Sequence, residues 1–185
     1  MPSLTRVTPP RDSFKYTEDW DISSGRVIPL SLTDVGKLEK YKVILHNPHA
    51  HVRNKNDWVL LASTVTELRV DNSCCNDPDF TELKMDVCAA LKLLVIDEKS
   101  LQYVNNLVIR GLSQLEEVSI GSKCFTETEG GRFEVSDCNA LKRVSIGDEC
   151  CSEWSEFVLK NCSVEEVSIG DGCFVYFQNT VFEGE

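Results

Sequence analysis

The sequence predicts a β-rich solenoid, in which short parallel strands stack coil upon coil and few or no regular helices form. Two observations carry this prediction. An apolar motif recurs along the chain every 23–27 residues, and each interval has room for two short strands. The chain has 185 residues, of which 42% are hydrophobic, so it can bury a substantial core. The same composition excludes disorder, a collagen helix and a coiled coil as its main character.

The motif is clearest in the second half of the chain. It reads L-x-x-V-x-I-G, and a cysteine with an apolar neighbour follows three residues after the glycine. The clear copies are residues 115–121 with Cys124 and Phe125, residues 141–147 with Cys150 and Cys151, and residues 164–170 with Cys173 and Phe174. A second pattern, F-x-V-x-x-C, lies between the copies, as in residues 133–138. Each repeat unit therefore contains two apolar segments.

Weaker copies extend the pattern towards the N-terminus. They start at Leu91, Val65 and Leu38, which makes the successive periods 27, 26, 24, 26 and 23 residues. The earliest copy takes its apolar positions from Leu38, Tyr41, Val43, Trp58, Leu60 and Ser63. We therefore predict about six units over residues 30–185, the last of them incomplete. Residues 1–29 do not fit the motif and are predicted to form an arm or an N-terminal cap.

The spacing of the motif has a physical explanation. Apolar residues at positions i+3 and i+5 point to one face of a strand, and position i precedes it in a turn. The glycine after the strand is expected to permit a sharp corner or a positive φ. A single coil cannot bury its inner face alone, so coils must stack at about 4.8 Å and share one core.

The motif resembles the leucine-rich repeat segment L-x-x-L-x-L-x-x-N-x-L, and its Ile-Gly and Cys-Phe pairs are similar to the BspA-like subclass of protists and some bacteria. The resemblance covers roughly residues 30–185 and is clearest from residue 88 onward. It implies a leucine-rich-repeat-like solenoid that binds proteins on its strand face. The sequence departs from the family at the ninth position, where the usual asparagine is replaced by Ser73, Lys123, Glu149 and Gly172. The asparagine ladder of the family is therefore missing.

Charge and the chain termini bear on the class of partner and on location. The formal charge is −11, and residues 61–185 carry 10 basic against 23 acidic side chains, a net −13. This balance argues against a nucleic-acid partner. No apolar run reaches the roughly 18 residues of a membrane span, and residues 1–10 lack the apolar region of a secretory signal. We therefore predict no membrane insertion and a cytoplasmic location.

The cysteines and histidines are the candidate metal ligands. The nine cysteines are odd in number and follow the repeat, which favours reduced structural thiols in the core over disulfides or a metal site. On this basis Cys150→Ser is expected to leave an unpaired buried hydroxyl. His46, His49 and His51 can in principle bind zinc or nickel, but a solvated loop is the favoured interpretation. No metal and no cofactor are predicted.

The exposed positions around the predicted strands form the candidate binding face. If the coils stack in register, an acidic pair, a basic pair and a second acidic pair become neighbours across strands, and three serines line up beside them. These residues are Glu116, Glu117, Ser119, Lys142, Arg143, Ser145, Glu165, Glu166 and Ser168. Two interpretations stay open. The opposite charges can satisfy one another across the strands, or the face can dock a partner.

The predicted function is a non-enzymatic protein–protein interaction module that presents this face. No nucleophile elbow, phosphate-binding loop or zinc-protease motif occurs in the sequence. The alternative is a structural subunit that associates end to end through its solenoid, because no polar cap follows the last unit. We expect that the natural chain continues or that a partner covers this end, with truncation favoured. A site in the loops between strands would be needed for an enzyme.

Overall fold

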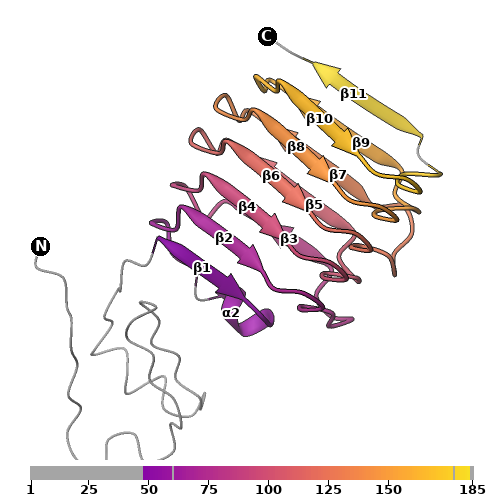
Figure 1. Cartoon of the computed structure of the whole chain (residues 1–185), viewed down its shortest axis with the longest axis horizontal. Coiled ribbons are helices and arrows are strands. Elements are labelled where there is room, and N and C mark those ends of the chain that lie inside the picture. The colour runs from indigo at the N-terminus through magenta and orange to yellow at the C-terminus, as the bar shows by residue number, and fades with distance from the viewer. Residues whose placement is uncertain (1–47, 60, 177, 184–185) are drawn as a thin grey trace, which may run out of the picture. The chain divides into compact units, whose positions relative to one another are not determined.

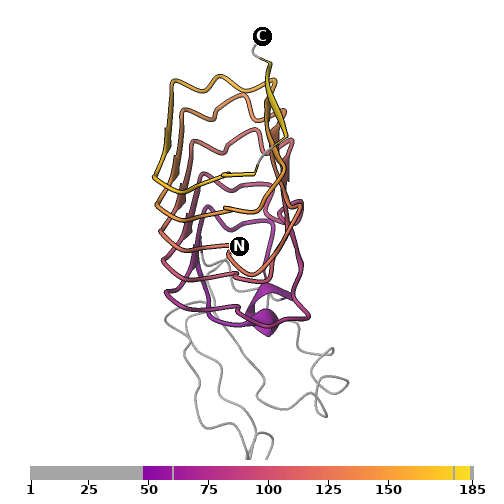
Figure 2. The same ribbon diagram turned by 90° about the vertical axis from the view of Figure 1, so that its right-hand side faces the viewer.

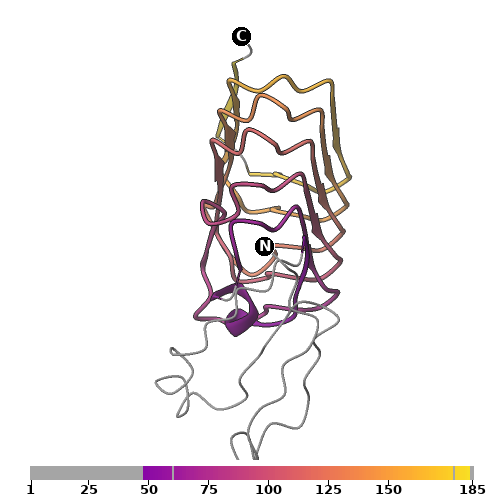
Figure 3. The same cartoon turned by 90° about the vertical axis from the view of Figure 1, so that its left-hand side faces the viewer.

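The computed structural model describes residues 48–59, 61–176 and 178–183, and these residues form a β-solenoid of about five turns (Figure 1). From β2 onward, each turn contributes one strand to each of two parallel sheets, which form opposite walls of the coil (Figures 2 and 3). Sheet A contains β1 (His49–Val52), β2 (Glu67–Val70), β4 (Leu93–Ile96), β6 (Glu117–Ile120), β8 (Arg143–Ile146) and β10 (Glu166–Ile169). Sheet B contains β3 (Glu82–Lys84), β5 (Asn106–Arg110), β7 (Arg132–Ser136), β9 (Glu156–Lys160) and β11 (Asn179–Glu183). The predicted fold class is confirmed.

All strand pairs are parallel and in register, so residues at one repeat position form a row across the coils. Val118 aligns with Val144, and Val144 aligns with Val167 in the next coil. From Val65 onward the observed rows match the repeat starts read from the sequence. The regular period places the same side chain over its equivalent at every turn, and this alignment produces a continuous core.

The core lies between the two sheets. The first apolar row of sheet A is fully buried at Leu91, Leu115 and Leu141. On the sheet B side, the rings of Phe133 and Phe157 stack with centroids 5.0 Å apart and planes inclined by 9°. The core runs continuously along the stack, and each turn contacts only the turns directly before and after it.

The glycine that follows strands β6, β8 and β10 has a different reason from the predicted one. Gly121 and Gly147 do not adopt a positive φ. A Cβ on Gly121 would lie 2.7 Å from the backbone nitrogen of Glu98, and a Cβ on Gly147 would lie 2.7 Å from that of Ser122. Close approach between successive turns therefore excludes a side chain here. The positive φ values lie further on, for example 61° at Lys123.

The cysteine that follows each glycine bridges two coils. The Cys150 thiol donates to the carbonyl oxygen of Gly121 at 3.0 Å, and its sulfur accepts from the backbone N–H of Cys124 at 3.4 Å. Cys173 repeats this arrangement one coil later. Ser100 occupies the same position, and its hydroxyl donates to the carbonyl oxygen of Asp71 at 2.8 Å. A ladder of thiols with one hydroxyl thus links successive coils.

The nine cysteines are all free thiols, six of them buried and three partly buried. This agrees with their prediction as structural core residues. The expectation that Cys150→Ser leaves an unpaired hydroxyl rests on a wrong premise. Ser100 shows that a hydroxyl at this position has a hydrogen-bond partner in the preceding coil.

The first described coil differs from the sequence prediction. His49 and His51 lie in strand β1, which pairs with β2, so the histidine segment is not a loop there. The spacing from β1 to β2 is shorter than the predicted 27 residues, because Ala50 aligns with Leu68. The predicted second strand through Trp58 is replaced by helix α2 (Lys55–Val59).

Helix α2 begins at a capping residue. The Asn54 side-chain oxygen accepts the backbone N–H groups of Asn56 at 2.9 Å and of Asp57 at 3.1 Å. Leu60, the predicted arm at 1–29 and the proposed apolar positions before residue 48 lie outside the described residues. Within the described part of the chain, no helix is long and apolar enough to cross a bilayer.

Candidate functional site

The outward side of sheet A carries all the residues that the sequence suggested as a binding face. Glu117, Arg143 and Glu166 are direct cross-strand neighbours in successive coils. Ser119, Ser145 and Ser168 form the next outward row along the strands. Glu116, Lys142 and Glu165 each immediately precede a strand and are exposed. We call this surface the ladder face.

The strand-start row is held by the backbone of successive coils. Lys142 N–H donates to the carbonyl oxygen of Glu116 at 2.9 Å, and Glu165 N–H donates to that of Lys142 at 2.8 Å. These bonds continue the parallel ladder beyond the strands themselves. The predicted order of acidic, basic and acidic pairs is therefore present, coil by coil.

One ion pair of the ladder face forms as the sequence suggested. The Arg143 guanidinium donates to the Glu117 carboxylate at 2.6 Å and, through Nε, at 3.2 Å. This hydrogen bond, and then the charge of Glu117, raises the pKa of Arg143 above its usual value. Among the ion pairs of the described residues, none involves Glu116, Lys142 or Glu165. The face thus satisfies its own charges only in part.

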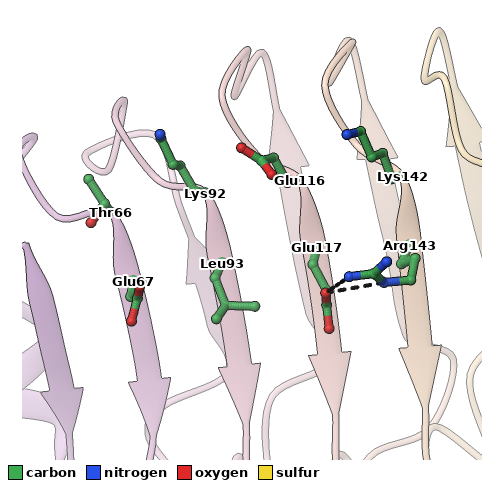
Figure 4. Close-up of a pocket in the computed structure, with 8 residues that line it drawn as sticks. All are labelled: Thr66, Glu67, Lys92, Leu93, Glu116, Glu117, Lys142 and Arg143. Atoms are coloured by element: carbon green, nitrogen blue, oxygen red, sulfur yellow. Dashed lines mark hydrogen bonds and ion pairs between the residues drawn. The ribbon is translucent and has the colours of Figure 1, made fainter.

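A groove of about 350 Å³ runs across four strands of this face (Figure 4). It lies along two rows of side chains, one at the strand starts and one at the first outward strand position. The lining residues are Thr66, Glu67, Lys92, Leu93, Glu116, Glu117, Lys142 and Arg143. Figure 4 shows Lys92, Glu116 and Lys142 at the strand starts, apart from the Glu117–Arg143 pair. Charge along the strand-start row therefore alternates in sign.

Sequence reasoning found half of the groove. Glu116, Glu117, Lys142 and Arg143 were candidates, whereas the serine row and the Glu165–Glu166 pair lie outside the groove lining. The other half, which includes Lys92 and Leu93, comes from weaker copies of the motif. These residues hold the same two repeat positions as Glu116 and Glu117, so extending the row to the weaker copies would have found them.

Towards β1, several charged side chains of the ladder face have hydrogen-bonding partners. The His49 Nδ1 lies 2.6 Å from the Glu67 carboxylate, and the His51 Nδ1 lies 2.9 Å from that of Asp71. Arg69 forms a two-point contact with Asp97, at 2.7 and 2.6 Å. The charged groups of the face that form no ion pair among the described residues lie in the groove and in the last coil.

A second charged cluster, which sequence reasoning missed, lies on sheet B. Glu134 is buried although it points outward, because Arg110 and Arg132 both contact its carboxylate, each at 2.5 Å. The hydrogen bond from Arg110, with further ones from Arg132 and Ser136, lowers the pKa of Glu134 to about 2. Arg132 also pairs with Glu156. All these groups are engaged with one another, so the cluster is a structural one.

In residues 48–183, as far as they are described, no group of three or more His, Cys, Asp or Glu side chains is placed to hold a metal ion. Comparison with family models, with curated proteins and with solved structures finds no match to this chain.

Proposed function

We propose that this protein is a non-enzymatic interaction module that binds a protein partner on the ladder face. The groove carries the proposal, because the charged groups of Lys92, Glu116 and Lys142 border it without an ion pair among the described residues. Half-buried Leu93 adds an apolar contact among them. An apolar contact surrounded by charges of alternating sign is suited to fix a partner in one register.

A charge-reversal experiment tests the docking site. Lys92→Glu/Lys142→Glu reverses both lysines of the groove, and Lys55→Glu/Lys99→Glu makes the same change in net charge at exposed positions outside it. Both variants are first checked for wild-type circular dichroism. In affinity capture from the source cell, we expect a stoichiometric partner with wild type and with the control variant, but not with the groove variant. A partner retained equally by all three proteins would place the binding site elsewhere.

We further propose that the coils are of the leucine-rich-repeat type, in the BspA-like form. The L-x-x-V-x-I positions that carry the resemblance form one continuous parallel sheet, which supports this assignment. The ladder of Cys124, Cys150 and Cys173 takes the hydrogen-bonding role of the missing asparagines. A reducing, cytoplasmic location belongs to the same proposal, supported by the nine free thiols.

A second candidate function is favoured by the last described coil. Val167, Ile169 and Phe182 are large apolar side chains that remain exposed there. A structural subunit could stack with further copies through this surface. In that case the chain would sediment as a dimer or larger species, and Phe182→Lys would return it to the monomer. A wild-type monomer at all concentrations tested would eliminate this candidate.

A further inference from the structure

Strand β10 is the outermost strand of sheet A, and its outer edge pairs with no strand that the structure describes. Its inward side chains Val167 and Ile169 are 38% and 43% exposed, whereas the equivalent Val144 and Ile146 in β8 are 1% and 2% exposed. An unpaired edge with an exposed apolar pair is a template for adding another strand.

The charges at this edge indicate which kind of strand would fit beside it. Arg143 binds Glu117 on its other side, and no ion pair of the described residues involves Glu165 or Glu166. In β6, β8 and β10, the first strand residue and the residue before it form a pair of like charges. The pair is acidic in β6, basic in β8 and acidic again in β10. The next group in this alternation is a basic pair, which would meet two carboxylates that form no ion pair among the described residues.

The backbone pattern is equally specific. At both ends of the paired strands of sheet A, the later coil donates to the earlier one: Lys142 N–H bonds to the carbonyl of Glu116, and Gly147 N–H bonds to that of Ile120. By the same pattern, the edge of β10 offers the carbonyl groups of Glu165 and Ile169 to a parallel strand.

We propose that the edge of β10 binds a parallel extended segment of a protein partner, in which two basic residues precede the pattern V-x-I-G. Residues 142–147 show that such a segment fits: as β8 they pair in register with an acidic strand on either side, β6 and β10. Glycine suits the position after the isoleucine, because at Gly121, Gly147 and Gly170 in turn a Cβ would lie within 2.7 Å of a backbone nitrogen in the preceding coil. This edge is a separate site from the groove.

The chain itself supplies the test peptides. A fluorescent peptide with the sequence of residues 141–160 contains the basic pair and both strands of one coil. Its matched control carries Lys142→Glu and Arg143→Glu, which reproduces the Glu-Glu pair found at residues 116–117. Binding to the 185-residue protein is followed by fluorescence anisotropy under reducing conditions. We expect the basic peptide to bind roughly tenfold tighter or better, because attraction replaces repulsion at both positions. Added salt should reduce the difference in affinity between the two peptides.

Variants of the protein test where the peptides bind and which charges cause the preference for the basic peptide. Glu165→Lys/Glu166→Arg should reverse the preference between the two peptides, and the milder Glu165→Gln/Glu166→Gln should abolish it. Ile169→Lys should weaken both peptides, whereas Lys92→Glu in the groove should change neither. The last variant separates this proposal from the proposed docking function, since the two sites fail independently.

Four outcomes would overturn the proposal. They are equal affinity for both peptides, no binding of either peptide, and an unchanged preference in both Glu165/Glu166 variants. The fourth is a self-associated wild-type protein that Ile169→Lys converts to a monomer, because a second copy would then occupy the edge.

Discussion

Single side chains hold neighbouring coils together through hydrogen bonds that a strand ladder alone does not supply. Cys150 donates to Gly121 and accepts from Cys124, so it satisfies two backbone groups of the preceding coil. Ser100 makes the same type of donation with an oxygen in place of sulfur. The position therefore selects for a short side chain that both donates and accepts, and not for sulfur itself.

Replacement of Cys150 should separate hydrogen bonding from volume. Cys150→Ala removes the acceptor of the Cys124 N–H and should cost about 1–3 kcal/mol of unfolding free energy. Cys150→Ser keeps a donor and an acceptor, so it should cost less than Cys150→Ala. Urea denaturation of both variants under reducing conditions gives the comparison. A serine variant no more stable than the alanine variant would show that packing alone matters here.

Glu134 should make the stability of the solenoid depend on acid. Its pKa falls from 4.5 to about 2 in the folded chain, so its contribution is present above about pH 4.5 and is lost as the pH falls towards 2. Glu134→Gln should destabilise the protein by about 1–3 kcal/mol at pH 7, a range discounted for solvent screening because the Arg110 and Arg132 side chains are 61% and 40% exposed.

The pH dependence is the decisive readout for Glu134. The difference in melting temperature between wild type and Glu134→Gln should be constant from pH 7 to about pH 5 and then shrink towards pH 2. Glu82→Gln, which removes an exposed pair with Lys84, is the control and should have little effect. A Glu134→Gln difference that does not change with pH would exclude the charge as its cause.

At the scale of the element, one strand is stabilised by the strands on both of its sides. Ile146 in β8 aligns with Ile120 in β6 and with Ile169 in β10, and it is 2% exposed. Ile169 occupies the same repeat position, but among the described strands it has a neighbouring strand on one side only. The sequence motif is identical in both strands, yet the energetic value of its isoleucine depends on the position in the stack.

Truncation of these two isoleucines should show the difference directly. Ile146→Ala should destabilise the protein by about 2–5 kcal/mol, because it opens a cavity between two packed coils. Ile169→Ala should cost clearly less, since its side chain is already 43% exposed. Chemical denaturation measures both values. Equal costs would mean that the edge strand is packed as tightly as the interior one.

On the scale of the whole solenoid, the described residues are organised by contacts between successive coils. Each strand pairs only with its equivalents one coil before and one coil after. Stability in such a stack is close to a sum of unit and interface contributions. The fold should therefore tolerate the loss of a whole unit but not of a fraction of one.

Deletion of one whole period tests this organisation. Removal of residues 93–116 joins Lys92 to Glu117 and places β6 beside β2 without changing which sheet any strand enters. This variant should retain β-sheet circular dichroism and cooperative unfolding at a lower temperature. Removal of residues 93–104 should prevent folding, because it would direct a sheet B strand into sheet A. A half-unit deletion that folds as well as the full-unit deletion would contradict the coil assignment.

The periodic part of this molecule was readable from the sequence because the repeat is itself the fold. Once Leu115, Leu141 and Val164 are aligned, the in-register rows and the neighbouring charge pairs follow from the constant spacing within the motif. The prediction failed at the first described coil, where the apolar positions are irregular. There β1 and α2 replace the predicted arrangement, because pairing to β2 and packing of Trp58 against the core outweigh a weak match to the motif.

The sequence alone determined the solenoid, its period, the reduced thiols and the candidate face, since all of these repeat and local spacing encodes them. Only the tertiary structure decided which charges pair, where a neighbouring coil leaves no room for a side chain, and which strand edge has no partner among the described strands. Those properties depend on contacts between coils that, from β2 onward, are 23–26 residues apart in the sequence. Arg143 illustrates the distinction: its place in the ladder follows from the repeat, but its choice of Glu117 over Glu166 is made by side-chain geometry across the stack.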